Sequence, residues 1–179
     1  MTGVGSRWFR LGILLVVLLA FALRLYAIDR QDIWGDEAFS IWLSSQPLPQ
    51  VVAGGADTHP PLYPFSLFVW LRLAGASPLA VRFLSALIGA LTVPVAYVLA
   101  RRAVPPIFPT GGGQEQGAAA ILAALLAAVS PVLVYYSQET RMYGLVTLLA
   151  AASVYWTLRV FQQPAARRGW LAYFLFTLA

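Results

Sequence analysis

Apolar runs nearly as long as a lipid bilayer is thick recur along the chain, and they constrain its fold more than any other feature. A helix needs about 20 apolar residues to cross ~30 Å of hydrocarbon. Such runs occupy residues 11–28, 79–100, 118–136 and 143–161, and a shorter one occupies residues 170–179. They predict an all-α fold, a polytopic bundle of transmembrane helices. Because the last run is incomplete where the chain ends, we expect the N-terminal part of a longer membrane domain.

The first run follows two arginines, Arg7 and Arg10, as the core of a cleavable signal peptide also would. The run is long, however, and no small-x-small cleavage site comes after it. We therefore favour a retained helix over a signal peptide. Arg24 lies near the far end of this helix, and we expect its side chain to extend toward the membrane interface.

The charge pattern excludes several classes of protein. The net charge of +5 comes from twelve basic residues, all of them arginine, which stand singly or in pairs between the apolar runs. This distribution favours topology signals and contact with anionic membrane lipid over a nucleic-acid surface. The absence of cysteine excludes disulfides and thiolate metal sites.

Residues 29–77 are expected to form an external loop that carries most of the negative charge. Four of the seven acidic residues of the chain lie within nine positions of it. Read as a helix from about Trp34, this part places Asp36 and Glu37 on a polar arc and Trp42 on the opposite side. The pattern indicates an amphipathic helix lying at the membrane interface. A solvated loop is the alternative, but it has little use for large aromatic side chains.

The short apolar segment 62–76 decides the topology. If it is re-entrant rather than spanning, all three basic clusters face the cytoplasm, as the positive-inside rule requires. These clusters are Arg7/Arg10, Arg101/Arg102 and Arg167/Arg168. We favour that arrangement, which gathers the polar motifs of the chain on the opposite, non-cytoplasmic face.

Three polar motifs would then meet on one surface: the pair Asp36/Glu37, the single histidine His59, and Glu139 with Arg141. Ionisable groups at membrane depth are functional candidates because burying them is costly. An acid can take a proton from an incoming hydroxyl while a cation stabilises a departing phosphate. The alternatives are ordinary loop charges, a histidine that caps a turn, and a structural Glu139–Arg141 pair.

Arg141 is the residue that we expect to bind phosphate. Its guanidinium is charged and can engage two phosphate oxygens at once. Ser137 and Gln138 lie one helical turn before it and can complete the cradle.

The motifs together resemble a known family. They are Trp34-Gly35-Asp36-Glu37, His59-Pro60-Pro61-Leu62-Tyr63 and Tyr136-Ser137-Gln138-Glu139-Thr140-Arg141-Met142-Tyr143. This combination resembles the polyprenyl-phosphate-dependent glycosyltransferases of the GT-C superfold. The nearest group is glycosyltransferase family 39, with the protein O-mannosyltransferases and aminoarabinose transferases. The last of the three motifs is typical of the bacterial branch.

The resemblance implies an inverting transfer of a sugar from a polyprenyl phosphate to an acceptor, a protein or a glycolipid. The reaction would take place on the outer face of a bacterial plasma membrane. Asp36 would be the general base. Glu37 would be its neighbour, which organises the acceptor or an ion such as a divalent cation.

The same resemblance implies roles for the residues of the other two motifs. His59 and Tyr63 would lie at the donor site. Arg141 would bind the lipid phosphate with Gln138 beside it, and Glu139 would orient the arginine.

Two other classes of protein remain as alternatives at this stage. A transporter or lipid flippase would use Asp36, His59 and Arg141 as a relay. Transporters place charges inside their spans and often consist of repeated halves, whereas here the charges cluster at the ends of the runs and no repeat is visible. A structural membrane subunit explains the hydrophobicity but not the three polar motifs.

Overall fold

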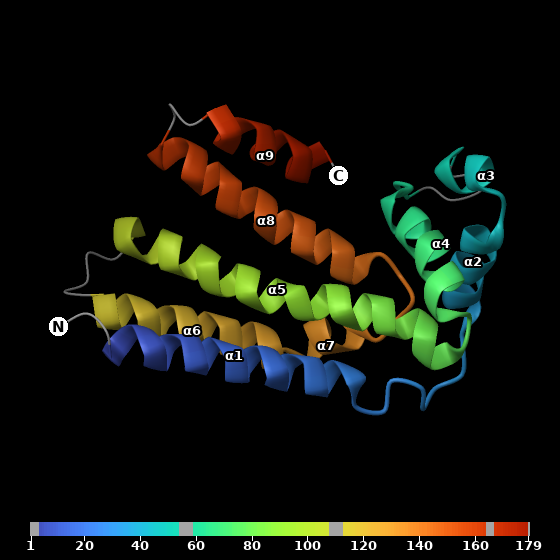
Figure 1. Ribbon diagram of the computed structural model, residues 1–179, viewed down its shortest axis with the longest axis horizontal. Helices are drawn as coiled ribbons and strands as arrows, with labels where there is room; N and C mark the ends of the chain where they lie inside the picture. The colour runs from blue at the N-terminus through green and yellow to red at the C-terminus, as the bar shows by residue number, and fades with distance from the viewer. Residues whose placement is uncertain (1–3, 54–58, 108–112, 164–166, 179) are drawn as a thin grey trace.

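The protein is a bundle of helices, as the computed structural model in Figure 1 shows. The structure describes residues 4–53, 59–107, 113–163 and 167–178, and within these ranges it contains helices and no strands. The helices are α1 (Val4–Leu25), α2 (Gly35–Ser45), α3 (Leu48–Ala53), α4 (Leu62–Ala74), α5 (Pro78–Ile107), α6 (Gly113–Val129), α7 (Pro131–Ser137), α8 (Tyr143–Gln162) and α9 (Arg167–Leu178). The predicted all-α fold is confirmed.

The long helices run side by side along the molecule, with α5 in contact with α1, α6 and α8. The short helices α2, α3 and α4 gather at one end, where α1 finishes and α5 and α8 begin (Figure 1). There, α4 runs across the long axis instead of along it (Figure 1). The end of the bundle that carries α2–α4 therefore brings together segments that lie far apart in the sequence.

Among the residues that the structure describes, three helices are long and apolar enough to cross a membrane, namely Arg7–Leu25, Pro78–Ala103 and Tyr143–Gln162, and the bent pair α6–α7 is a fourth candidate if it forms one span. Their outer faces carry large apolar side chains that stay exposed, such as Leu14 and Leu18 on α1. An extensive exposed apolar surface is what contact with lipid requires. The chain is thus an integral membrane protein.

Small residues fill the interior where the helices meet. One core cluster joins Val16 and Ala20 of α1, Val93 of α5, and Ala124 and Ala128 of α6. Small side chains let helix backbones approach closely, and close packing is what holds helices together where lipid removes the hydrophobic driving force.

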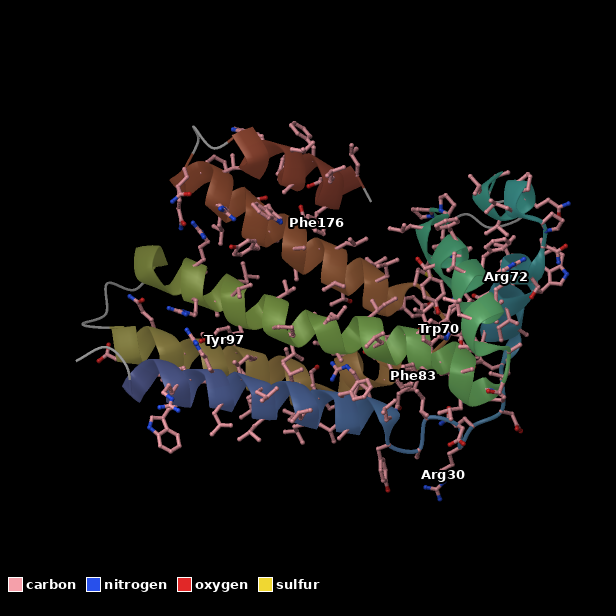
Figure 2. The ribbon with its side chains drawn as sticks, in the orientation of Figure 1. Arg30, Trp70, Arg72, Phe83, Tyr97 and Phe176 are labelled. Carbon is pink, nitrogen blue, oxygen red and sulfur yellow. The ribbon has the colours of Figure 1, made fainter. Side chains whose placement is uncertain are left out.

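Contacts of an aromatic side chain attach α4 to the bundle. The rings of Trp70 on α4 and Phe83 on α5 are stacked, with their centroids 6.0 Å apart (Figure 2). The Trp70 indole also donates a hydrogen bond to the carbonyl of Ala80 over 2.8 Å. These contacts hold α4 against the first turns of α5.

The third apolar run is broken into two helices, α6 and α7, whose axes differ by 54°. The break lies at Pro131, which has no backbone N–H to give to the carbonyl of Ala127 and whose ring crowds that carbonyl. The side chain of Ser130 caps the new helix by accepting a hydrogen bond from the backbone of Leu133. The sequence Ser130-Pro131 therefore both ends α6 and starts α7.

Arg24 satisfies the carbonyls that this break leaves open. Its guanidinium donates to the carbonyls of Ala127 (3.4 Å) and Ala128 (3.2 Å), and its Nε donates to Ser137 Oγ (3.2 Å). The side chain is fully buried. The expectation that Arg24 extends to the membrane interface is wrong, because the broken helix offers acceptors inside the bundle. A positive charge at the C-terminal end of α6 also complements the helix dipole.

Helix α5 passes very close to α7 and Arg24, and Gly89 makes this possible. A Cβ at position 89 would lie 2.6 Å from the Cβ of Ser137 and 3.3 Å from Arg24 Nε. A Cβ at Gly144 on α8 would meet only ordinary contacts, the nearest being the carbonyl of Ser85 at 3.5 Å.

We predict that Gly89→Ala lowers the thermal stability of the purified protein in detergent, by about 1–3 kcal/mol for an overpacked core. Gly144→Ala is the control, since the added methyl group would meet only ordinary contacts. It should leave stability unchanged or raise it. Equal shifts of the unfolding temperature in the two variants would show that the close approach at Gly89 carries no weight.

Candidate functional site

The polar motifs meet at the end of the bundle that carries α2, α3 and α4 (Figure 1). Helix α2 begins with the acid pair Asp36 and Glu37, and it packs against α4. The connection between α7 and α8, residues 138–142, also contacts α2, through both Asp36 and Glu37. The two acids are adjacent in sequence, but their surroundings differ completely.

Glu37 is fully buried and bound by four donors. Its carboxylate accepts hydrogen bonds from Arg82 Nε (2.9 Å), Arg82 Nη2 (2.6 Å) and the backbone N–H of Thr140 (2.8 Å). The backbone N–H of Trp34 donates a fourth bond over 3.5 Å. Because both oxygens are occupied, Glu37 is part of the framework that shapes the site.

Arg82 extends the same network to the connection between α1 and α2. Its remaining N–H groups donate to the carbonyls of Ile28 (2.9 Å), Gln31 (2.7 Å) and Asp32 (3.1 Å). The pair Glu37–Arg82 thus joins α2, α5, the 26–34 connection and the 138–142 connection.

The charge on Glu37 is stabilised by these partners. Burial alone would raise the pKa of the Glu37 carboxyl, but the hydrogen bonds from Arg82 and Thr140 and the positive charge of Arg82 lower it below its ordinary value of 4.5. Glu37 is therefore an anion at neutral pH, and its ion pair with Arg82 is intact.

Asp36 faces outward beside a buried cation. Its side chain is 52% exposed, and its Oδ2 lies 3.9 Å from Nη2 of Arg141. Arg141 is 7% exposed, and its Nη1 donates to Ser40 Oγ over 3.2 Å. Its Nε has no hydrogen-bond partner. The site thus combines an accessible carboxylate with a buried guanidinium that keeps an unused donor.

The other predicted residues have different surroundings. His59 is half-buried and lies just before α4. The buried Tyr63 hydroxyl is 2.7 Å from Ser85 Oγ, so it ties α4 to α5. Gln138 donates to carbonyls at the end of α1, at 2.9 Å for that of Tyr26.

The ion pair of Arg141 is made with Asp36 and not with Glu139. Burial raises the pKa of the Glu139 carboxyl above its ordinary value, against a hydrogen bond from Tyr135 and the charge of Arg141. Ser137, expected to help cradle a phosphate with Gln138, instead bonds to Arg24.

Sequence reasoning missed Arg82 as a partner of the acid pair. The signal was present, since a charged residue near the start of a long apolar run is costly and calls for a partner. Its partner is 45 residues away, and no local spacing points to it.

The residues present do not fit a divalent cation between the two acids. Glu37 is already bound by Arg82 and Thr140, which leaves Asp36 as the one available carboxylate of the pair. In the part of the chain that the structure describes, no group of three or more histidine, cysteine or acidic residues is placed to hold a metal ion.

Residues 58–179 match the sequence model of the dolichyl-phosphate-mannose-protein mannosyltransferase family. The chain belongs to this family. The resemblance to the GT-C glycosyltransferases is thereby confirmed, and the chain is placed among membrane glycosyltransferases of the mannosyltransferase type. The matched part contains His59, Arg82 and Arg141 but not the acid pair. No curated protein and no solved structure matches the chain.

We predict that Glu37→Gln strongly destabilises this member of the mannosyltransferase family. The change leaves Arg82 buried without its counter-charge, which costs about 3–5 kcal/mol. Asp36→Asn, at the neighbouring exposed position, should cost less than ~1 kcal/mol. Thermal unfolding of both variants in detergent tests this, and similar losses would contradict the framework role of Glu37.

The same variant has a defined pH dependence. The pKa of Glu37 is lower in the folded state than its ordinary value of 4.5. The ion pair therefore contributes its full stability above pH 4.5, and this contribution is lost as the pH falls toward and through the folded-state pKa. The stability difference between wild type and Glu37→Gln should therefore be constant near neutrality and narrow below about pH 4.5. A difference that stays unchanged down to pH 3 would contradict this assignment.

Proposed function

We propose that this protein transfers a sugar from a polyprenyl phosphate to an acceptor hydroxyl on a protein or glycolipid, with inversion at the anomeric carbon. The observation that carries the proposal is the juxtaposition of Asp36 and Arg141. An exposed carboxylate stands 3.9 Å from a buried guanidinium whose Nε is unsatisfied. A buried donor without a partner is costly unless a ligand completes it, and a lipid phosphate has the oxygens to do so.

The chemistry assigns one step to each group. The Asp36 carboxylate takes the proton of the acceptor hydroxyl as its oxygen forms a bond to the anomeric carbon. The bond from that carbon to the phosphate oxygen breaks, and its electron pair leaves with the phosphate. Arg141 stabilises the charge that develops there. Attack from the face opposite to the phosphate inverts the configuration, and it requires the exposed Asp36 side chain to move away from Arg141 so that the anomeric carbon lies between the two groups.

His59 and Tyr63 belong to the surroundings of this pair in the proposal. The half-buried His59 would contact the donor at the start of α4. The buried Tyr63, bonded to Ser85, would hold that helix start in position. Glu37 and Gln138 would act through the backbone segments that they fix.

The orientation in the membrane follows from the basic residues. Arg7 and Arg10 start α1, Arg101 and Arg102 lie near the end of α5, and α9 begins at Arg167. These positions lie at the end of the bundle opposite to α2–α4 (Figure 1). The positive-inside rule supports a cytoplasmic location for that end, and hence a site that faces outward from a bacterial plasma membrane.

We predict that Asp36→Asn lowers turnover by about 10²–10⁴, the usual share of a general base, while donor binding persists. Asparagine keeps the shape of the side chain but cannot accept the proton. The measurement is a transfer assay on the full-length protein with a panel of polyprenyl-phosphate sugars that includes mannose. A turnover that stays within a few-fold of wild type would rule out Asp36 as the base.

We predict that Arg141→Lys weakens binding of the polyprenyl phosphate, because lysine keeps the charge but loses the forked donor geometry. Arg141→Ala should weaken it further. Arg72→Ala is the control, since Arg72 is an exposed arginine on α4 that bonds to the carbonyl of Phe68 in its own helix. Thermal shift of the full-length protein with added lipid is the readout. Equal shifts for Arg141→Ala and wild type would place the phosphate elsewhere.

A further inference from the structure

A cavity of about 620 Å³ opens between the 26–34 connection and the segment from α7 to the start of α8. It lies against Glu37 and Arg82, but neither Asp36 nor Arg141 is among its lining residues. Its size is within the range of small-molecule sites, about 300–1,000 Å³. The cavity, called here the tyrosine cavity, is thus a second concave surface beside the Asp36–Arg141 pair.

Aromatic side chains with a polar edge dominate its walls. They are Tyr26, Trp34, Tyr135, Tyr136 and Tyr143. Four of the eight tyrosines of the chain line the cavity, whereas none of the phenylalanines that the structure describes does so, although the chain has ten. A site for a lipid chain has no need of hydroxyl groups and would use phenylalanine or leucine as readily. The selection of tyrosine points to a ligand with both apolar faces and polar edges.

The rings form a connected surface that is open to a ligand. The centroids of Tyr136 and Tyr143 are 4.7 Å apart, and those of Tyr135 and Tyr136 are 5.3 Å apart. Tyr135 and Tyr136 nevertheless remain 53% and 40% exposed. Clustered rings that stay uncovered can bury further apolar area when a ligand packs against them.

Hydrogen-bonding groups complete the walls. Asp32, Gln31 and Glu139 all line the cavity. Carboxylates and amides accept hydrogen bonds from hydroxyl groups, and Gln31 also donates. A sugar ring matches this combination, because it presents C–H groups on its faces and hydroxyls around its rim.

We infer that the tyrosine cavity is a saccharide-binding site, in which the rings of Tyr136 and Tyr143 pack on a sugar face and Glu139 and Asp32 bind its hydroxyls. The inference rests on the proposed function for the identity of the sugar. Tyr143 connects the two sites, since its ring also lies 5.9 Å from the guanidinium carbon of Arg141. The sugar can come from the donor lipid or from a glycan acceptor, because both present the same chemistry.

The test measures binding of methyl α-mannopyranoside to the full-length protein by ligand-observed NMR. Tyr136→Ala should weaken binding about tenfold, the loss expected for one stacking ring. Tyr26→Ala should also weaken binding, and at 75% exposure its side chain can be removed without unfolding the protein. Tyr97→Ala is the control, because Tyr97 lies toward the other end of the bundle (Figure 2). The inference is overturned if wild type fails to bind the glycoside, or if both cavity variants bind it as wild type does.

Further arms separate this inference from the proposed function. Binding of sugar-free polyprenyl phosphate reports on Arg141 alone. If Arg141→Ala loses binding of this lipid but still binds the glycoside, both proposals are supported. If Tyr136→Ala weakens binding of the sugar-free lipid as much as binding of the glycosylated lipid, the cavity holds a prenyl chain and the inference is wrong. If the cavity variants raise the KM for the donor alone, the bound sugar belongs to the donor. If they raise the KM for the acceptor alone, it belongs to a glycan acceptor.

Discussion

The buried ion pair between Glu37 and Arg82 is the interaction on which the geometry of the site depends. Removing two charges from water costs several kcal/mol per ion, and this is offset only when every donor and acceptor finds a partner. Here the partners are backbone groups of the two connections that border the site, from Ile28 to Asp32 and at Thr140. The two connections must therefore keep one arrangement, because only that arrangement satisfies the buried pair.

A second buried arginine, Arg24, binds backbone groups deeper in the bundle. Pro131 breaks the third apolar run, and the carbonyls left open at Ala127 and Ala128 would be costly inside a membrane protein. Arg24 satisfies them and also bonds Ser137, the last residue of α7. The end of α7 is therefore fixed immediately before the connection that carries Arg141. Both framework arginines act mainly on backbone groups, which explains how polar residues in apolar helices can shape a distant site.

Two groups of the site differ from this framework because they keep free bonding capacity. Asp36 is exposed, and Arg141 is buried with an unsatisfied Nε beside it. The adjacent residues Asp36 and Glu37 therefore differ in their surroundings: Glu37 is saturated by protein donors, and Asp36 is accessible to a substrate. In the proposed reaction the framework has little to reorganise, because the charges that support it are already paired. The tyrosine cavity adds exposed rings on the other side of Tyr143.

The sequence by itself determined the helices, the membrane character and the family resemblance, because apolar run lengths and local motifs are written in neighbouring residues. It also indicated that the acid pair and Arg141 belong to one surface. Only the tertiary structure decided the partners. Glu37 pairs with Arg82 across 45 residues, Arg24 turns inward to a broken helix, and Arg141 pairs with Asp36 instead of Glu139. These choices depend on which helix ends meet in space, and no periodicity within a single helix carries that information.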